Sequence, residues 1–182
     1  MIEPLLEIRT PRLVLRPFDS EDLTDTYIGW LNDPEVVRYS NQRFRRHDHA
    51  SCKAYLESYV GSDNLFVIVH RALDGIALGT MSAYRSRQHG TADVGILMGQ
   101  RANWGQGYGQ EAWSALLDWL AMLPGMRKLT CGTLACNHAM RRLAERSGMH
   151  HEATRRDQEL VDGQAQDMLY FARFSDMGAR VV

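Results

Sequence analysis

The first third of the chain changes from an alternating to a helical pattern of apolar positions. Residues 12–18, RLVLRPF, alternate apolar and polar side chains as a half-buried strand does. Apolar residues recur at helical spacing over 19–32. The Asp-Pro-Glu sequence at 33–35 predicts a second helix, because Asp caps, Pro fits the first helical position and Glu complements the dipole. A third helix is predicted over 48–60, with an apolar side formed by Cys52, Tyr55, Leu56 and Tyr59.

From residue 65 onward, short apolar runs separated by turn signals predict a sheet. Three strands are expected at 65–71, 76–85 and 91–99, divided by Asp-Gly and His-Gly turns. The order of elements predicts an α/β (α+β) fold with a mixed sheet and helices on both faces, in a single domain over 1–182. The remaining elements are a helix that ends at Pro124-Gly125, a strand at 128–134, a helix at 137–148 with its arginines outward, and two strands in 151–174.

The composition excludes several classes of protein but does not indicate a function. Of the 182 residues, 45% are hydrophobic and 24% charged, and the formal net charge is -1, so we expect no nucleic-acid or membrane partner. No apolar run approaches the roughly 20 residues of a membrane-spanning helix, and an early acid and proline in residues 1–13 argue against a signal peptide. Three cysteines without metal spacing favour reduced thiols and a cytoplasmic protein.

A glycine-rich stretch, NWGQGYGQEA at 103–112, runs directly into a predicted helix. It is either a flexible turn or a loop whose amides wrap an anion at the helix N-terminus. In a simple turn, three glycines would cost backbone entropy on folding without any gain in packing. In an anion-binding loop, the lack of side chains lets the backbone approach the anion closely. A nucleotide P-loop is excluded because no Gly-Lys-Ser/Thr follows, and a dinucleotide fingerprint lacks the acid expected after the next strand. Coenzyme A remains as the candidate anion.

The segments 92–119 and 127–153 resemble the GNAT superfamily of acyl-CoA N-acyltransferases, and RTPRLVLRPF and WLNDPEVVRYS resemble its branch of ribosomal-protein and amino-sugar acetyltransferases. The resemblance implies a mostly antiparallel, twisted sheet of about six to seven strands, with acetyl-CoA as cosubstrate and no metal. It also implies a pantetheine-binding strand, a pyrophosphate loop in which Trp104 replaces the usual Gln or Arg, and a helix-capping Asn. These roles fall on Ile96, Leu97, Met98, Trp104, Gly105, Gln106, Gly107, Tyr108, Gly109 and Asn137.

Acetyl transfer to an amine needs a base, because a free alkyl amine has a pKa of roughly 10. Asp93 is the candidate base, since it interrupts an otherwise apolar strand, although it could simply mark the exposed start of that strand. His138 is a second candidate, but a solvent-facing His at a helix start explains it as well. The resemblance implies a backbone N–H near Leu97 as oxyanion donor. The hydroxyl acid of relatives is missing, because its positions are Ala144 and Met140.

The basic segment RFRRHDH at 43–49 is either a solvated loop or the rim of an acceptor site. Its alternating His and Asp residues lack metal-ligand geometry, so no metal is expected. In relatives the segment borders the acceptor entrance, where a basic rim favours a small anionic amine, such as a nucleotide-linked amino sugar. The alternatives are an acetyltransferase of protein N-termini and a silent acyl-CoA-binding domain, and a homodimer stays open. The expected acceptor-binding residues are Arg43, Arg45 and Arg46.

Overall fold

The computed structural model describes residues 7–175. Residues 1–6, which belong to the segment 1–13 in which we expect no signal peptide, lie outside the described residues. The strands are β1 (Ile8–Arg9), β2 (Leu13–Pro17), β3 (Leu65–Arg71), β4 (Ala77–Ser86), β5 (Thr91–Met98), β6 (Lys128–Leu134), β7 (His150–Val161) and β8 (Gln164–Phe174). The α-helices are α1 (Asp25–Asn32), α2 (His49–Glu57), α3 (Tyr108–Ala121) and α4 (His138–Arg146). Short 3-10 helices lie at η1 (Ser20–Asp22), η2 (Asn41–Phe44) and η3 (Arg101–Asn103).

All eight strands form one sheet in the order β1-β2-β3-β4-β5-β6-β8-β7. Only β5 and β6 are parallel, and every other pair is antiparallel. The predicted mixed, mostly antiparallel sheet is therefore confirmed. The strand count exceeds the expected six to seven because β1 has two residues, too few to give an alternating pattern.

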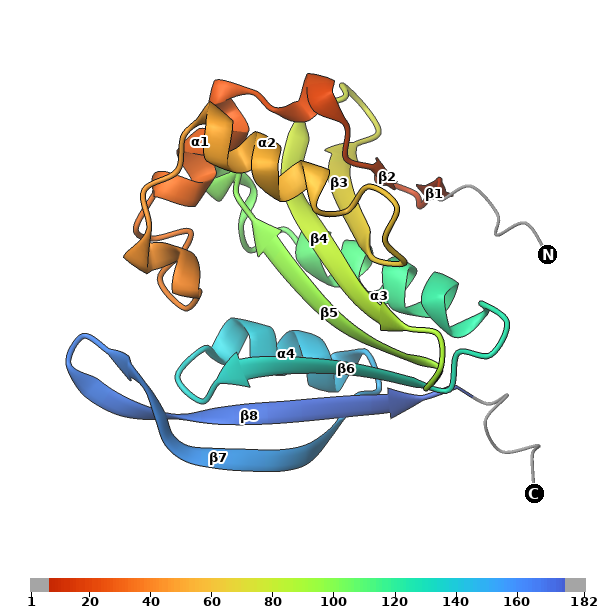
Figure 1. The fold of residues 1–182 in the computed structure, drawn as a ribbon, viewed down its shortest axis with the longest axis vertical. Helices are drawn as coiled ribbons and strands as arrows, with labels where there is room; N and C mark the ends of the chain where they lie inside the picture. The colour runs from red at the N-terminus through yellow and green to blue at the C-terminus, as the bar shows by residue number, and fades with distance from the viewer. Residues whose placement is uncertain (1–6, 176–182) are drawn as a thin grey trace.

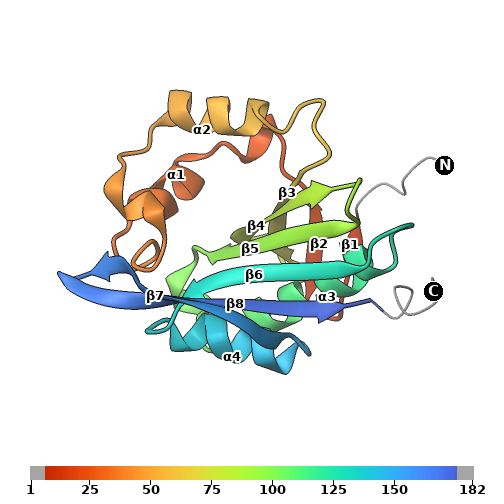
Figure 2. The same ribbon diagram turned by 60° about the horizontal axis from the view of Figure 1, so that its bottom comes forward.

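Helices cover both faces of the sheet, as predicted (Figure 1, Figure 2). On one face, Trp113 and Leu116 of α3 pack against Val67 and Val69 of β3 in the larger core. On the other face, the aromatic residues of α1 and α2 pack against Phe66 and Ile68 of the same strand in a smaller core. Because β3 is buried on both sides, its sequence is continuously apolar rather than alternating.

The helix predicted from 33–35 does not form. The Asp33 carboxylate accepts a hydrogen bond from the backbone N–H of Glu35 at 2.9 Å, and only one helical bond follows, from Val37 N to Asp33 O. Ser40 then caps the short η2 helix instead. Side-chain bonds to nearby backbone offer such a segment an alternative to helix, so the chain between α1 and α2 becomes a series of turns.

The sheet divides at β5 and β6, and this division creates the site. The two strands pair over only three residues, from Thr91–Lys128 to Asp93–Thr130. Beyond that point they diverge, as Figure 1 shows between the green and teal strands. Residues 94–98 of β5 and 131–134 of β6 therefore face each other across a gap.

Candidate active site

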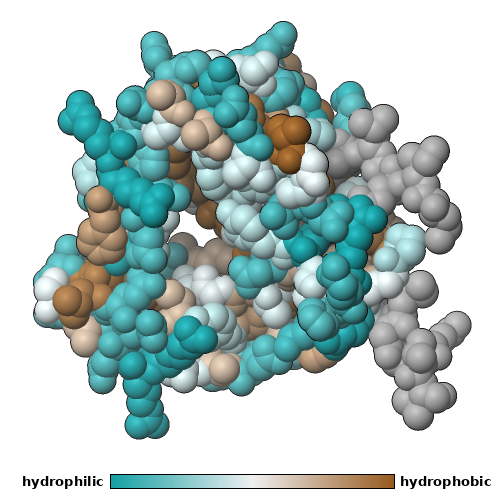
Figure 3. Space-filling model, viewed as in Figure 1, coloured by the Kyte–Doolittle hydropathy of each residue, from teal (hydrophilic) through white to brown (hydrophobic). Residues whose placement is uncertain are grey.

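One cavity of about 980 Å³ extends through this gap and is lined from both sides of the sheet. One end is lined by the glycine stretch and α4, and the other by α1, α2 and the segment between them. Figure 3 shows the surface hollowed between the α1–α2 region and the lower strands. A continuous cavity of this kind can bring two ligands together from opposite ends.

The glycine stretch has a left-handed backbone at two of its positions. Gly105 and Gly107 have φ values of 77° and 81°, a region that costs other residues strain. Gly107 is the N-cap of α3, and none of the described side chains caps that helix end. The first N–H groups of α3 are therefore left for a ligand, which is how helix N-termini bind anions.

Trp104, the departure from the family pattern, closes this loop onto the sheet. Its indole N–H donates to the Met98 carbonyl at 2.8 Å, and the guanidinium of Arg101 lies 5.9 Å from its ring centre. The tryptophan thus ties the loop to the end of β5. A Gln or Arg at this position would offer a side chain to the ligand, whereas Trp104 shapes the loop.

Arg12, from the turn before β2, holds the same loop from the outside, and no sequence pattern indicated this role. It donates to the Gln106 carbonyl at 2.9 Å and to the Glu111 carboxylate at 2.6 Å, and its guanidinium lies over the Tyr108 ring. Burial alone would raise the pKa of Glu111, but hydrogen bonds from Thr10 and Arg12 outweigh it and lower that pKa. The ion pair of Arg12 and Glu111 therefore contributes its full stability at pH values above the ordinary pKa of a carboxyl group. This contribution is lost as the pH falls through the lowered pKa of Glu111.

We expect Arg12→Ala to weaken acetyl-CoA binding about five- to tenfold, corresponding to about 1–1.4 kcal/mol, because the loop loses its outer support. Isothermal titration calorimetry measures the change. Arg9→Ala is the matched control, since within residues 7–175 the exposed Glu7 is the one ion-pair partner of Arg9. Equal affinities in the two variants would refute the supporting role of Arg12.

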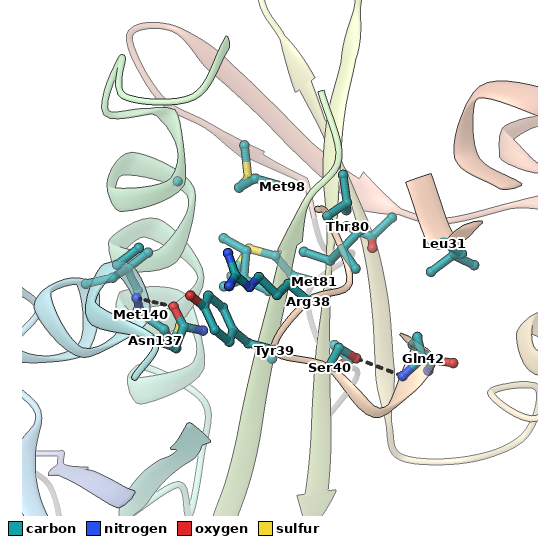
Figure 4. Close-up of a pocket in the computed structure, with 18 of the residues that line it drawn as sticks. Leu31, Arg38, Tyr39, Ser40, Gln42, Thr80, Met81, Met98, Asn137 and Met140 are labelled. Carbon is teal, nitrogen blue, oxygen red and sulfur yellow. Dashed lines mark hydrogen bonds between the residues drawn. The ribbon is translucent and has the colours of Figure 1, made fainter. Parts of the chain in front are cut away.

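Asn137 stands at the start of α4, as the resemblance implied, and it lines the cavity. Its side-chain carbonyl accepts from the Met140 N–H at 3.2 Å, which leaves its amide N–H groups for the cavity. Figure 4 shows Tyr39 extending from the opposite wall toward Asn137 and Met140. Ala144 is fully buried in the core, so that position does not face the cavity. Arg142 and Arg146 of this helix are exposed as expected, and they also line the cavity rim, whereas Arg141 is half-buried and donates to the Ala135 carbonyl at 3.2 Å.

The backbone of β5 presents alternate residues to the gap. The Ala92 carbonyl lies 3.5 Å from Thr130 Oγ1 on β6, and the Met98 carbonyl accepts from Trp104. Successive strand residues direct their backbone groups to opposite edges. Ile96 and Met98 therefore face the gap, on the same edge of β5 at which Ala92 pairs with β6, whereas the backbone of Leu97 is directed toward Thr80 on β4.

Asp93 lies at the last position at which β5 pairs with β6, and it is directly across from Tyr84 of β4. Its carboxylate accepts from the Thr130 hydroxyl at 2.7 Å. Desolvation raises the pKa of Asp93, and the Thr130 bond offsets this only in part. The residue is nevertheless exposed to solvent and is not among those that line the cavity. His138 is exposed and also lies outside the lining.

The three arginines of the basic segment divide between two tasks. Arg45 and Arg46 line the cavity, and neither forms an ion pair with a residue in 7–175. Arg43 does not line it. Its guanidinium donates to the Leu160 carbonyl at 3.1 Å and lies 3.5 Å from the Glu159 carboxylate.

The tip of the β7–β8 hairpin thereby holds the η2 segment in place. Besides the contacts of Arg43, Arg38 pairs with Asp162 at 3.2 Å. Figures 1 and 2 both show the hairpin tip beside the turns between α1 and α2. The cavity is therefore enclosed on this side by a segment fixed at both ends.

Other chemistry is less well supported. Among the described residues no group of three or more His, Cys, Asp or Glu could hold a metal, and Asp48 instead caps α2. Cys52 is buried, and burial raises its pKa. None of the helices within 7–175 combines the length and apolar character that a membrane crossing needs.

Comparison with known proteins gives a consistent family. A model described as an acetyltransferase (GNAT) domain matches residues 12–150. An uncharacterized N-acetyltransferase p20 of Bacillus licheniformis is 26% identical over 90% of this chain and 93% of its own. Spermidine N-acetyltransferase of Vibrio cholerae, solved with CoA and spermine, has a TM-score of 0.81 at 15% identity, covering 94% of this chain and 100% of its own. A ribosomal L7/L12 alpha-N-protein acetyltransferase in complex with CoA has a TM-score of 0.82 at 16% identity, covering 94% and 99%.

Proposed function

Because this chain belongs to the GNAT acetyltransferase family, and is an acyltransferase, we propose that it transfers an acetyl group from acetyl-CoA to the primary amine of a small anionic acceptor. The observation that carries the choice of acceptor is the pair Arg45 and Arg46 in the cavity wall. The proposal places acetyl-CoA at the glycine-loop end and the acceptor at the α1–α2 end.

The residues of the first end fit coenzyme A. The α3 N-terminus and the loop from Trp104 to Gly109 would hold the pyrophosphate through backbone N–H groups. The cations Arg142 and Arg146 would face the remaining phosphate. The edge of β5 at Ile96 and Met98 has no strand partner across the gap. Its backbone groups would bond the two amides of the pantetheine arm, which would satisfy backbone groups that no strand pairs with.

When bound, acetyl-CoA supplies the thioester carbonyl. The acceptor amine attacks this carbonyl directly, because the one cysteine in the lining, Cys52, is buried with a raised pKa and is a poor nucleophile. Of the backbone donors at 96–98, we favour the Ile96 N–H over that of Leu97 for the oxyanion, since Ile96 faces the gap. Asp93 is the proposed base, and its raised pKa brings it closer to the pKa of an amine.

Charge at the second end separates the acceptor classes. The cations in the wall are Arg38, Arg45 and Arg46, and Glu35 is the acid among them. Arg38 is already paired with Asp162. The balance is positive, which disfavours a polyamine or a basic peptide and favours a phosphate or carboxylate. Spermidine, the acceptor named for one structural neighbour, is therefore not our first choice here.

We expect the enzyme to acetylate a UDP- or dTDP-amino sugar faster than a ribosomal-protein N-terminal peptide, in competition at low and moderate salt. Arg45→Glu with Arg46→Glu should lower kcat/KM for the sugar nucleotide about tenfold or more, about 1.4 kcal/mol, and most strongly at low salt. Arg156→Glu, on the exposed face of β7, is the control and should change little. Faster acetylation of the peptide, unaffected by the double reversal, would overturn the choice of acceptor.

A silent acyl-CoA-binding domain is the second candidate, and Met140 favours it, because Met140 lines the cavity without supplying the usual hydroxyl acid. Release of free thiol from acetyl-CoA in the presence of an amine panel distinguishes the two. The silent domain binds acetyl-CoA but releases no amine-dependent thiol.

A further inference from the structure

Three tyrosine hydroxyls meet at the acceptor end of the cavity. The hydroxyl oxygens of Tyr55 and Tyr59 lie 2.6 Å apart, those of Tyr55 and Tyr84 2.8 Å apart, and those of Tyr59 and Tyr84 3.0 Å apart. Tyr55 and Tyr84 line the cavity. These three side chains, here called the tyrosine triangle, come from α2, the turn after it, and β4.

Packing fixes the triangle against one aromatic ring. Phe66 of β3 lies 5.2 Å from the ring centres of both Tyr55 and Tyr59. Burial raises the pKa of each of these two tyrosines, so both are neutral at any assay pH. Tyr55 and Tyr59 therefore present uncharged hydroxyls that are held rigidly against Phe66.

The hydrogen-bonding capacity of the triangle indicates what it can bind. Each phenol has one hydrogen to donate, and three hydrogens satisfy the three sides of the triangle. What remains for a ligand is a lone pair on each oxygen. Lone pairs turned toward a cavity suit a group that donates, and an ammonium is such a group.

The triangle also connects the cavity with Asp93. Tyr84 is directly opposite Asp93 in the β4–β5 register, so the two side chains are neighbours on one face of the sheet. Asp93 itself is absent from the cavity lining. Tyr84 is 47% exposed. It lines the cavity and is the member of the triangle that lies opposite Asp93 on the neighbouring strand.

We propose that the tyrosine triangle removes the proton from the acceptor ammonium and passes it toward Asp93. The ammonium N–H bond breaks as Tyr55 accepts the proton, the hydroxyl proton of Tyr55 moves to Tyr59, and that of Tyr59 moves to Tyr84. The hydroxyl proton of Tyr84 turns away from Tyr55 and leaves to the Asp93 carboxylate, directly or through solvent. The amine keeps the electron pair with which it attacks the thioester. All three tyrosines are neutral before and after, no covalent bond forms to the protein, and Asp93 afterwards releases the proton to solvent.

This inference rests on the proposed acetyl transfer, and its test uses whichever of the UDP-amino sugar and the ribosomal-protein peptide the parent enzyme acetylates faster. We expect Tyr55→Phe and Tyr84→Phe each to lower kcat about tenfold or more, with KM for acetyl-CoA within twofold. Tyr59→Phe should lose less, because the direct contact of Tyr55 with Tyr84 remains. Tyr170→Phe, on β8 outside the cavity lining, should match the parent.

Two further measurements separate a relay from a structural contact. In mixtures of H₂O and D₂O, kcat of the parent should show a curved proton inventory, and Tyr84→Phe a linear one. Tyr84→Phe combined with Asp93→Asn should lose no more than the worse single variant, because both interrupt one path. Full activity in Tyr84→Phe, or losses that multiply with those of Asp93→Asn, would overturn the relay while the acetyl transfer stands. A parent enzyme that acetylates neither probe would instead refute the proposed function, and the relay with it.

Discussion

Asp93→Asn is expected to lower kcat by roughly 10²–10⁴-fold, the usual cost of losing a positioned base, with little change in the KM for acetyl-CoA. The active form of Asp93 is the carboxylate, and desolvation raises its pKa above the ordinary range. Activity of the parent should therefore fall as pH falls through this raised pKa. The variant should lack that acidic limb. A stopped thiol-release assay across pH measures both effects.

The same substitution should leave the fold intact. Desolvation penalises the charged form of Asp93, and the neutral amide can still accept from the Thr130 hydroxyl that bonds the carboxylate at 2.7 Å. We expect an unchanged or higher Tm. Asp118→Asn on the exposed side of α3 is the control for removal of a carboxylate. Turnover within a few-fold of the parent at every pH would exclude Asp93 and leave solvent as the base.

The second large effect is expected from Gly107→Val, which should weaken acetyl-CoA binding by at least about a hundredfold. Gly107 has a φ of 81°, and an added Cβ would lie 3.4 Å from Arg12 Nη2, so a valine there strains the backbone of the proposed phosphate loop and disturbs its outer support. The strained φ alone costs on the order of 1–3 kcal/mol of stability. Calorimetry with acetyl-CoA measures the loss of affinity, and thermal unfolding measures the strain.

Gly75→Val separates strain from loss of the site. Gly75 has a φ of 71° with nothing within 4 Å of an added Cβ, and it lies in the turn between β3 and β4. The two valines carry similar backbone strain, but only the one at Gly107 borders the cavity. If both variants bind acetyl-CoA equally, the assignment of the loop to pyrophosphate is wrong.

Local patterns predicted the parts of the fold that local interactions determine. The strands at 65–71 and 128–134 begin and end where the apolar runs do, and the glycine conformations at 105–107 follow from the absence of a Cβ. The prediction at 33–35 was wrong because the features of a helix start also suit a turn closed by the Asp33 side chain.

Contacts between distant segments had no signal in the sequence. Arg12 reaches Gln106 and Glu111 across more than ninety positions, and its role depends on the pairing of the first strands. The tyrosine triangle joins α2 to β4. Taken singly in the sequence, each of its tyrosines is indistinguishable from an aromatic residue of the core. Arg43 belonged to a basic run, yet the hairpin tip takes it out of the cavity wall. Basic character could be predicted, but the direction of each side chain could not.

The fixed segment between α1 and α2 also determines the shape of molecule that can enter. Residues 38–43 are anchored to the hairpin tip at Leu160 and Asp162, so the acceptor end has a closed rim and not an open trough. A closed rim admits what can be threaded through it end first: a small molecule, or the free terminus of a chain. A lysine in the middle of a folded surface would have to bring its flanking backbone through the same opening. We therefore expect the rim to select slender acceptors, in addition to any selection by charge or hydrogen bonding.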